Sequence, residues 1–154
     1  MPTTLYGLGD NYPPENSHVL PALFRRFYKA KQRDDTIVTC WVTGKPLRKF
    51  LRINDLGKAC AHALEVYNLN PGEPIQHLNV GFGIDLPIRD HANHIAMGVD
   101  FNRDIYWKTT KPDGTPKKQL DMSRLEAMGW KAEITLEQGH TEVYSDHLKG
   151  EVRR

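Results

Sequence analysis

The segment ENSHVLPALFRRF, residues 15–27, places a histidine directly before a proline-containing amphipathic stretch. An imidazole changes charge near neutral pH, so His18 is a candidate proton donor or acceptor. The same ring at the start of a helix also suits a structural role at the helix end or at the surface. The residues alone leave both interpretations of His18 open.

Cationic side chains gather in three short segments. They are Arg25, Arg26 and Lys29; Lys45, Arg48, Lys49 and Arg52; and Lys111, Lys117 and Lys118. A single run of charges is usually a solvated face. Here Arg48 and Lys111 lie at turns that follow predicted strands, where open α/β sheets bind ligands, and such cations suit a diphosphate. Trp41 offers a flat surface for a sugar or base, or else it belongs to the core or an edge.

Other patterns that could perform chemistry are incomplete. In NVGFGIDL, residues 79–86, Leu86 stands where a dinucleotide-binding turn needs its third glycine, so a structural turn is favoured. His91 and His94 have i, i+3 spacing on one predicted helix without a third metal ligand, so we interpret them as solvated and predict no metal site. The chain has no GxSxG and no patterned Cys–His pair, which removes support for covalent catalysis.

Apolar residues recur at helical spacing in three segments that would position these side chains. They predict helices over residues 18–32, 54–67 and 88–99. Ser17 and Asn54 are the expected N-caps of the first two helices. Cys60 and Leu64 fall on the apolar face of the second helix, which predicts that they are buried.

Alternating or β-branched runs predict the strands. They cover residues 36–42, 48–53, 75–81 and 104–109. A short helix is expected to stop at Gly129, and TLEQ at 135–138 is a capping box that opens a last helix. The alternation of strands and helices predicts an α/β fold with a mainly parallel sheet.

The size and composition of the chain restrict its class. Its 154 residues are the size of one domain, and 21 Lys and Arg against 19 Asp and Glu do not favour nucleic-acid binding. Two cysteines form no disulfide framework, which is typical of a reducing cytoplasm. No leader and no membrane-spanning apolar run is evident, so a soluble, cytoplasmic protein without a membrane partner is expected.

Four segments, in a matching order, resemble the GDP-L-fucose synthases. They are PTTLYGLGDNYPPENSHVLPALFRRF, W.TGKPLRKFL..ND, HLNVGFG and TKPDGTPKKQLDMSRLEAMGW. The resemblance covers about residues 2–148 and concerns only the C-terminal half of that family, which belongs to the extended short-chain dehydrogenase/reductases. It implies an incomplete Rossmann sheet plus the smaller substrate-binding lobe, as a single unit over 1–154, with the N-terminal NADP-binding half absent.

The same resemblance implies roles for individual residues. His18 matches the acid of the family's epimerisation step, opposite a cysteine base that is absent here. The positions that match ligands of the GDP-sugar, GDP-4-keto-6-deoxymannose, are Arg26, Trp41, Arg48, Lys111 and Asp113. The positions that match the lining of NADP(H) are Pro2, Thr3, Thr4, Leu5 and His18. Members of the family are homodimers.

The chain departs from the family's pattern at several positions. Thr4 replaces an asparagine, Val42 replaces a glycine, and Lys49 and Arg52 stand where acidic and histidine residues are usual. The Gly-rich first turn, the serine and the Tyr-x-x-x-Lys motif of the family are missing from the sequence.

We therefore expect a chain that does not complete the family reaction alone. That reaction is NADPH-dependent 3,5-epimerisation and 4-reduction of the keto sugar to GDP-L-fucose. A separately encoded N-terminal half would make the chain part of a split enzyme. The alternative is a non-enzymatic GDP-sugar-binding module or an inactive relic.

Overall fold

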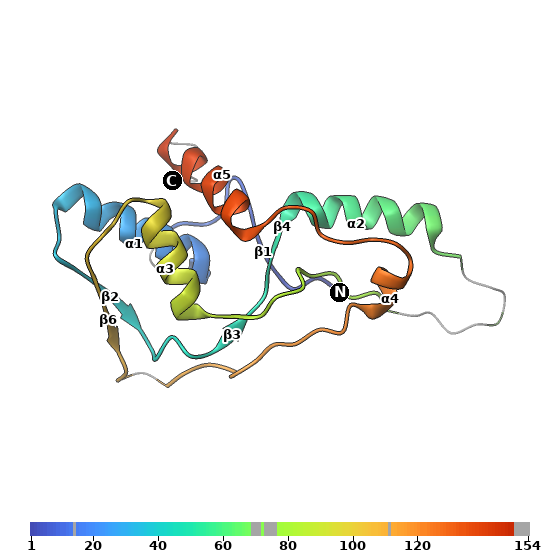
Figure 1. Ribbon diagram of the computed structural model, residues 1–154, viewed down its shortest axis with the longest axis horizontal. Coiled ribbons are helices and arrows are strands. Elements are labelled where there is room, and N and C mark those ends of the chain that lie inside the picture. Colours follow the sequence, from blue (N-terminus) through green and yellow to red (C-terminus); the bar gives the residue numbers. More distant parts are fainter. Residues whose placement is uncertain (14, 69–71, 73–76, 111, 150–154) are drawn as a thin grey trace.

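The computed structural model describes residues 1–13, 15–68, 72, 77–110 and 112–149, and they form an α/β fold (Figure 1). At one end of an elongated molecule, three helices pack together over a pair of strands. The helices are α1 (Val19–Arg33), α3 (Ile88–Gly98) and α5 (Leu136–Leu148), and the strands are β2 (Ile37–Trp41) and β6 (Asp104–Lys108). The predicted α/β class is confirmed.

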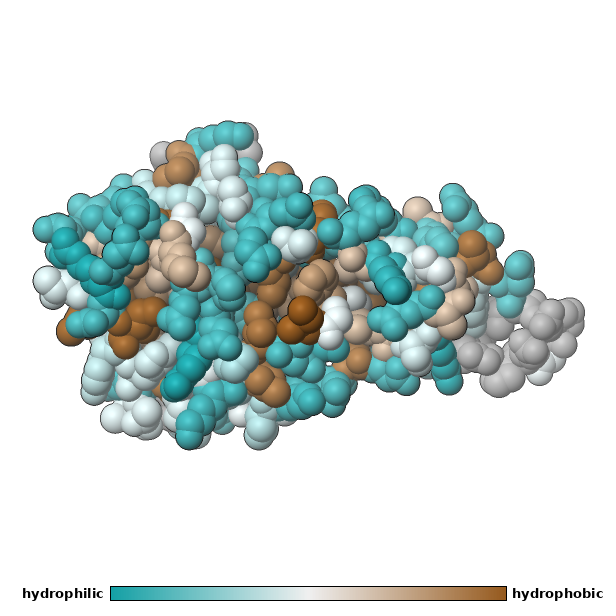
Figure 2. All heavy atoms as spheres, viewed as in Figure 1, coloured by the Kyte–Doolittle hydropathy of each residue, from teal (hydrophilic) through white to brown (hydrophobic). Residues whose placement is uncertain are grey.

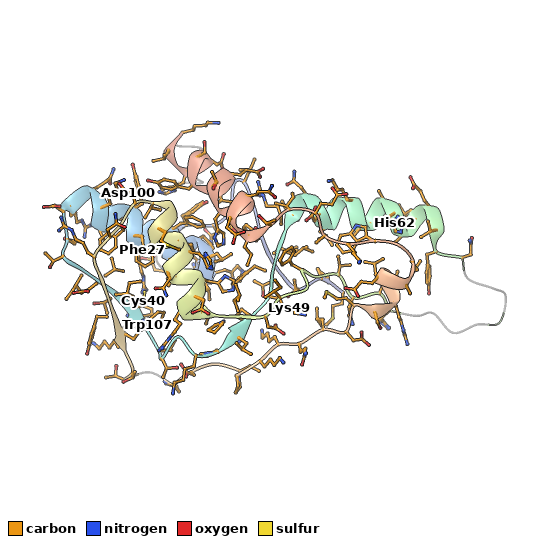
Figure 3. The ribbon with its side chains drawn as sticks, in the orientation of Figure 1. Phe27, Cys40, Lys49, His62, Asp100 and Trp107 are labelled. Atoms are coloured by element: carbon orange, nitrogen blue, oxygen red, sulfur yellow. The ribbon has the colours of Figure 1, made fainter. Side chains whose placement is uncertain are left out.

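Short pairs of strands build the rest of the frame. In the middle of the molecule, β1 (Thr4–Tyr6) runs parallel to β4 (Phe50–Arg52), while β3 (Leu47–Arg48) is antiparallel to β5 (Leu86–Pro87). The β2–β6 pair is parallel, in a register that sets Cys40 opposite Trp107 (Figure 3). The described strands thus form separate two-stranded sheets, two of them parallel, where the sequence predicted one mainly parallel sheet.

The other end of the molecule is built from α2 (Ile53–Val66) and α4 (Ser123–Ala127) (Figure 1). A second hydrophobic cluster lies there. Its buried members are Leu51, Ala59, Val80, Leu125 and Trp130. The larger cluster contains Phe24 and Phe27 of α1 together with Val38, Cys40 and the inner face of α3.

The helix α1 confirms the periodic pattern of its sequence. Leu20, Leu23, Phe24 and Phe27 recur at helical spacing and are all buried. The N-cap is His18 and not Ser17, and it makes no side-chain capping hydrogen bond. The predicted cap was wrong because the helix begins one residue later than expected.

The helix α5 begins as its sequence predicts. The Thr135 hydroxyl accepts a hydrogen bond from the Gln138 amide, and the Gln138 side chain accepts one from the Thr135 amide, which completes the capping box. Gly129, which follows α4, adopts a φ of 92°, and this agrees with the predicted stop.

The helix α2 departs from its predicted burial. It begins at Ile53 with Arg52 as N-cap, so Asn54 lies inside the helix. Asp55 and Ala59 are the buried residues of this helix. Cys60 is exposed, and Leu64 is 87% exposed. The expectation that Cys60 lies in the core was therefore wrong.

The predicted strand over 75–81 is not formed in its described part. Residues 75 and 76 lie outside the described residues, and from 77 to 81 only Val80 pairs, in an isolated parallel bridge with Pro2. Within the described residues, no helix is both long and apolar enough to cross a bilayer.

Candidate functional site

A hollow of about 920 Å³, the main cavity, opens beside β1 in the middle of the molecule. Segments far apart in the sequence line it. They are residues 1–8 and 10, His18 at the start of α1, Arg48, Lys49, Ile53, and residues 117–120. The cavity thus brings together His18, Arg48 and the stretch 2–5, which the sequence analysis had connected only through the family resemblance.

His18 reaches the cavity because α1 is fixed behind it. Leu20 and Pro21 in the first turn are buried, and the Ala22 amide donates to the His18 carbonyl at 3.0 Å. The imidazole itself is exposed and makes no capping hydrogen bond. A ring in this position is free to contact a ligand in the cavity.

Arg48 forms part of the opposite wall. Its Nη1 donates to its neighbour's carbonyl, Leu47 O, at 2.7 Å and to Thr115 O at 2.8 Å. Lys117 and Lys118, which are exposed, line the same cavity. This wall therefore carries three cations, and it suits an anionic ligand such as a diphosphate.

The stretch 2–5 enters the cavity wall through β1. The Thr3 hydroxyl donates to the Lys49 carbonyl at 3.0 Å, and the Thr3 amide donates to the Val80 carbonyl at 2.9 Å. Thr3, Thr4 and Leu5 are half-buried, whereas Pro2 is exposed. Because backbone and side chain of Thr3 are both bonded within the protein, the strand presents a fixed surface to the cavity.

A second hollow of about 420 Å³, the side groove, lies between α1 and β2. It contains Arg26 and Trp41, so the five predicted sugar-nucleotide ligands are not all in one hollow. Arg26 donates from Nη1 to the Thr39 carbonyl at 3.1 Å, and its guanidinium lies 4.4 Å from the Trp41 ring centroid. The Trp41 side chain is half-exposed, which excludes the alternative of a core role.

The side groove is strongly basic. Besides Arg26, three cations of α1 line it, namely Arg25, Lys29 and Arg33, against one acidic residue, Asp35. Ser17 lines the groove and its neighbour His18 lines the main cavity, so consecutive residues before α1 contribute to both hollows.

Of the two predicted ligand residues in the KPDG segment, 111–114, the structure describes one. Lys111 lies outside the described residues. Asp113 is exposed and lines neither hollow, and it accepts hydrogen bonds from the Thr43 amide and the Thr43 hydroxyl. These two bonds hold the pKa of the Asp113 carboxyl below its ordinary value.

Two cations of the second cluster do not lie on a solvated face. Lys49 is 6% exposed and has its Nζ 3.9 Å from Asp85 Oδ2. Arg52 is 2% exposed and binds Glu142 Oε2 through Nε and Nη2, at 3.1 and 2.8 Å. The expectation of solvated charges was wrong for these two residues, because each has an acidic partner distant in sequence.

The histidine pair of α3 also differs from its interpretation as solvated. His91 is fully buried against the Phe50 ring, and His94 is half-buried. Burial lowers the pKa of His91 to about 4, although its contact with the Arg48 carbonyl acts in the opposite direction. Among the described residues, no group of three or more His, Cys, Asp or Glu side chains is placed to hold a metal ion.

Several residues of the main cavity had no separate signal in the sequence. Leu8 and Ile53 are exposed apolar residues on its wall, Tyr6 ends β1 there, and Gly7 continues the wall beyond the strand. Figure 2 shows that hydrophobic side chains gather over the middle of the molecule, where Figure 1 places β1 and β4. Its proximity to the PTTL stretch would have indicated that Ile53 lines the cavity. That proximity arises only from the pairing of β1 with β4.

The chain matches one family model and several known proteins. Residues 1–81 match the model of the NAD dependent epimerase/dehydratase family. The chain is 44% identical over 154 residues to GDP-L-fucose synthase 1 of Arabidopsis thaliana, covering all of this chain and 46% of that protein. It is 42% identical over 157 residues to GDP-L-fucose synthase of Escherichia coli strain K12, covering 99% of this chain and 49% of that protein.

A solved structure shares the fold. It is a GDP-L-fucose synthetase from Naegleria fowleri bound to NADP, with a TM-score of 0.83 and 28% identity, covering 97% of this chain and 44% of that one. The chain thus spans about half the length of the proteins it matches. Because the family model covers more than half of its residues, the chain belongs to the NAD dependent epimerase/dehydratase family.

Proposed function

We propose that this chain forms the GDP-sugar-binding half of an NADPH-dependent GDP-4-keto-6-deoxymannose epimerase/reductase. The observation that carries the proposal is the 42–44% identity to GDP-L-fucose synthases along the whole chain. The sugar end of the ligand would occupy the main cavity beside His18, and the nucleotide would extend over the start of α1 toward Trp41. The arrangement is supported by the consecutive positions of Ser17, which lines the side groove, and His18, which lines the main cavity.

His18 would act as the proton donor of epimerisation. A base removes a proton from the sugar carbon next to the keto group and leaves an enolate; an acid then adds a proton to the opposite face, which inverts that carbon. The exposed imidazole in the main cavity suits the second of these steps. Cys40 is buried in the core and Cys60 lies on α2, and neither lines the cavity, so another group must act as the base.

The residues of this chain fit only one end of the nicotinamide cofactor. The β1 stretch gives a flat, half-buried wall that could lie against the nicotinamide ring. In the described residues, however, no glycine-rich turn leads directly from a strand into a helix to cradle the phosphates. Neither binding of the cofactor's phosphates nor a hydride step is therefore attributed to this chain.

Binding of the substrate class is tested by calorimetry. GDP-mannose is titrated into the full chain and into R48A, which should weaken binding about tenfold or more because a charge-assisted contact to the diphosphate is lost. H18N should change the affinity less than about twofold, since a proton donor need not anchor the ground state. D104A, which removes an exposed carboxylate on β6, is the matched surface control.

Turnover is tested separately. With NADPH and GDP-4-keto-6-deoxymannose, the chain alone should leave the absorbance of NADPH unchanged, because its sequence has no Tyr-x-x-x-Lys motif to supply the proton donor of reduction. Sustained oxidation of NADPH would contradict this expectation. Absence of GDP-mannose binding in the unmodified chain would overturn the proposed function, and binding without turnover would also fit a non-enzymatic module.

A further inference from the structure

Asp113 joins two segments that shape the main cavity. Its Oδ1 accepts a hydrogen bond from the Thr43 amide at 2.9 Å, and its Oδ2 accepts one from the Thr43 hydroxyl at 2.6 Å. The Thr43 hydroxyl oxygen also accepts a bond from the Lys45 amide at 3.1 Å. Both carboxylate oxygens are thus engaged by one residue of the turn after β2.

The contact between the two segments continues beyond this pair. The Arg48 guanidinium donates to the Thr115 carbonyl at 2.8 Å, and the Leu47 amide donates to the Pro116 carbonyl at 2.8 Å. The 113–118 segment therefore follows the chain from the turn into β3. Its far end, residues 117 and 118, lines the main cavity.

The turn that Thr43 belongs to is itself fixed. The Thr43 and Gly44 carbonyls accept hydrogen bonds from the Arg89 side chain and amide, both at 2.9 Å, at the start of α3. Gly44 has a φ of 71°, and a Cβ there would lie 2.8 Å from the Trp107 ring. A turn that is anchored on α3 and packed against β6 provides a rigid support for the 113–118 segment.

We propose that Asp113 is a positioning residue, which through Thr43 holds the 113–118 segment so that Lys117 and Lys118 face the main cavity beside Arg48. The inference rests on the proposed function, because the diphosphate of a GDP-sugar is the anion these cations would bind. Asp113 acts without contacting the ligand, since it lines neither hollow and its oxygens are already bonded. This differs from the direct role that the family resemblance implies.

A substitution of Thr43 distinguishes a positioning role of Asp113 from direct contact with the ligand, because Thr43 also lines neither hollow. In calorimetry with GDP-mannose, T43V should weaken binding about three- to tenfold, because it removes the hydroxyl that donates to Asp113 and accepts from the Lys45 amide, and D113A should weaken it at least as much. The double variant T43V/D113A should bind no more weakly than D113A, whereas T43S should restore the affinity. If D113A weakens binding while T43V does not, Asp113 is a direct ligand and the proposal is overturned.

Hydrogen exchange tests the same contact without any ligand. D113A should accelerate exchange of the Thr43 and Leu47 amides about tenfold or more, because both are protected by the 113–118 segment. The controls are D104A on β6 and T141V, whose hydroxyl donates only within α5, to the Glu137 carbonyl. If the unmodified protein fails to bind GDP-mannose, the proposed function fails. Independently of that result, unchanged exchange of the Leu47 amide in D113A would refute the positioning role of Asp113.

Discussion

Val42 adopts a backbone conformation that suits glycine and not a β-branched residue. Its φ is 65°, and its amide donates to the Lys108 carbonyl at 3.0 Å, so the β2–β6 pairing holds it there. A left-handed conformation costs an ordinary residue about 1–2 kcal/mol. The conformation of Val42 therefore leaves strain in the turn next to Trp41, which lines the side groove.

The variant V42G should relieve that strain. We expect a net gain of about 1 kcal/mol in the free energy of unfolding, because the larger entropy of glycine in the unfolded chain cancels part of the relieved strain. The thermal midpoint should rise by about 3 °C for a chain of this length. Urea and thermal unfolding measure both quantities. V42A, which keeps a Cβ, should gain less, and a loss of stability in V42G would contradict the strained assignment.

Single residues also show where reasoning from the sequence was insufficient. Arg52 belongs to a basic run, and such runs are usually solvated, yet it is buried against Glu142, 90 residues away. No local pattern indicates that partner. The local motif around His18 made it a candidate, and it lines the main cavity, whereas the placement of Arg26 in a different hollow from Arg48 depends on how α1 lies against β2.

At the scale of elements, α5 approaches β1 at a glycine. A Cβ on Gly139 would lie 2.0 Å from the Tyr6 hydroxyl and 2.8 Å from the adjoining ring carbon. Tyr6 is 3% exposed and packs edge-on against Phe50 and His140, so its ring cannot move aside easily. The absence of a side chain at this position lets the helix dock on the strand.

G139A should therefore destabilise the fold even though alanine is the better helix former. Overpacking of this kind costs about 1–3 kcal/mol, more than the gain of about 1 kcal/mol in helix propensity. The matched control is G57A in α2, where a Cβ meets nothing within 4 Å, and it should stabilise the protein. Chemical denaturation compares the two, and equal effects from both variants would refute the docking role of Gly139.

The helices also show what periodicity can predict. In α1 and α3 most apolar positions are buried, because neighbouring helices and strands cover them. In α2 the same spacing puts Leu64 into solvent. A helical period identifies the apolar face of a helix but contains no information on whether another element covers that face. Likewise, the predicted strands over 36–42 and 104–109 contain β2 and β6, whereas the predicted strand over 75–81 is not formed in its described part and β1 was not predicted, because short pairings depend on long-range contacts.

The whole molecule couples its stability to pH through two buried histidines. His91 and His140 lie in the larger hydrophobic cluster with ring centroids 6.4 Å apart. Burial is the main cause that lowers the pKa of each to about 4, from an ordinary value of 6.5. The unfolded chain therefore binds more protons than the folded one below pH 6.5, and folding stability falls as the pH falls from 6.5 toward 4.

This coupling predicts acid sensitivity. Lowering the pH from 7 to 5 should reduce the free energy of unfolding by about 2 kcal/mol for each of the two histidines. Urea unfolding at a series of pH values measures this loss. H91N and H140Q should each reduce the slope of stability against pH, even if they lower stability at pH 7. H77Q, which changes an exposed histidine, should leave the slope unchanged. A flat profile between pH 7 and pH 5 would contradict the buried neutral state of both rings.

The exposure of Cys60 and the burial of Cys40 give the protein two thiols of unequal reactivity. Cys40 is 1% exposed, and burial raises the pKa of its thiol, so an electrophile such as a maleimide should modify Cys60 alone in the folded state. Modification of Cys40 would require β2 to detach from α1. A fluorophore attached to Cys60 therefore reports on the α2 end of the molecule. The rate at which Cys40 is labelled measures how fast the other end opens.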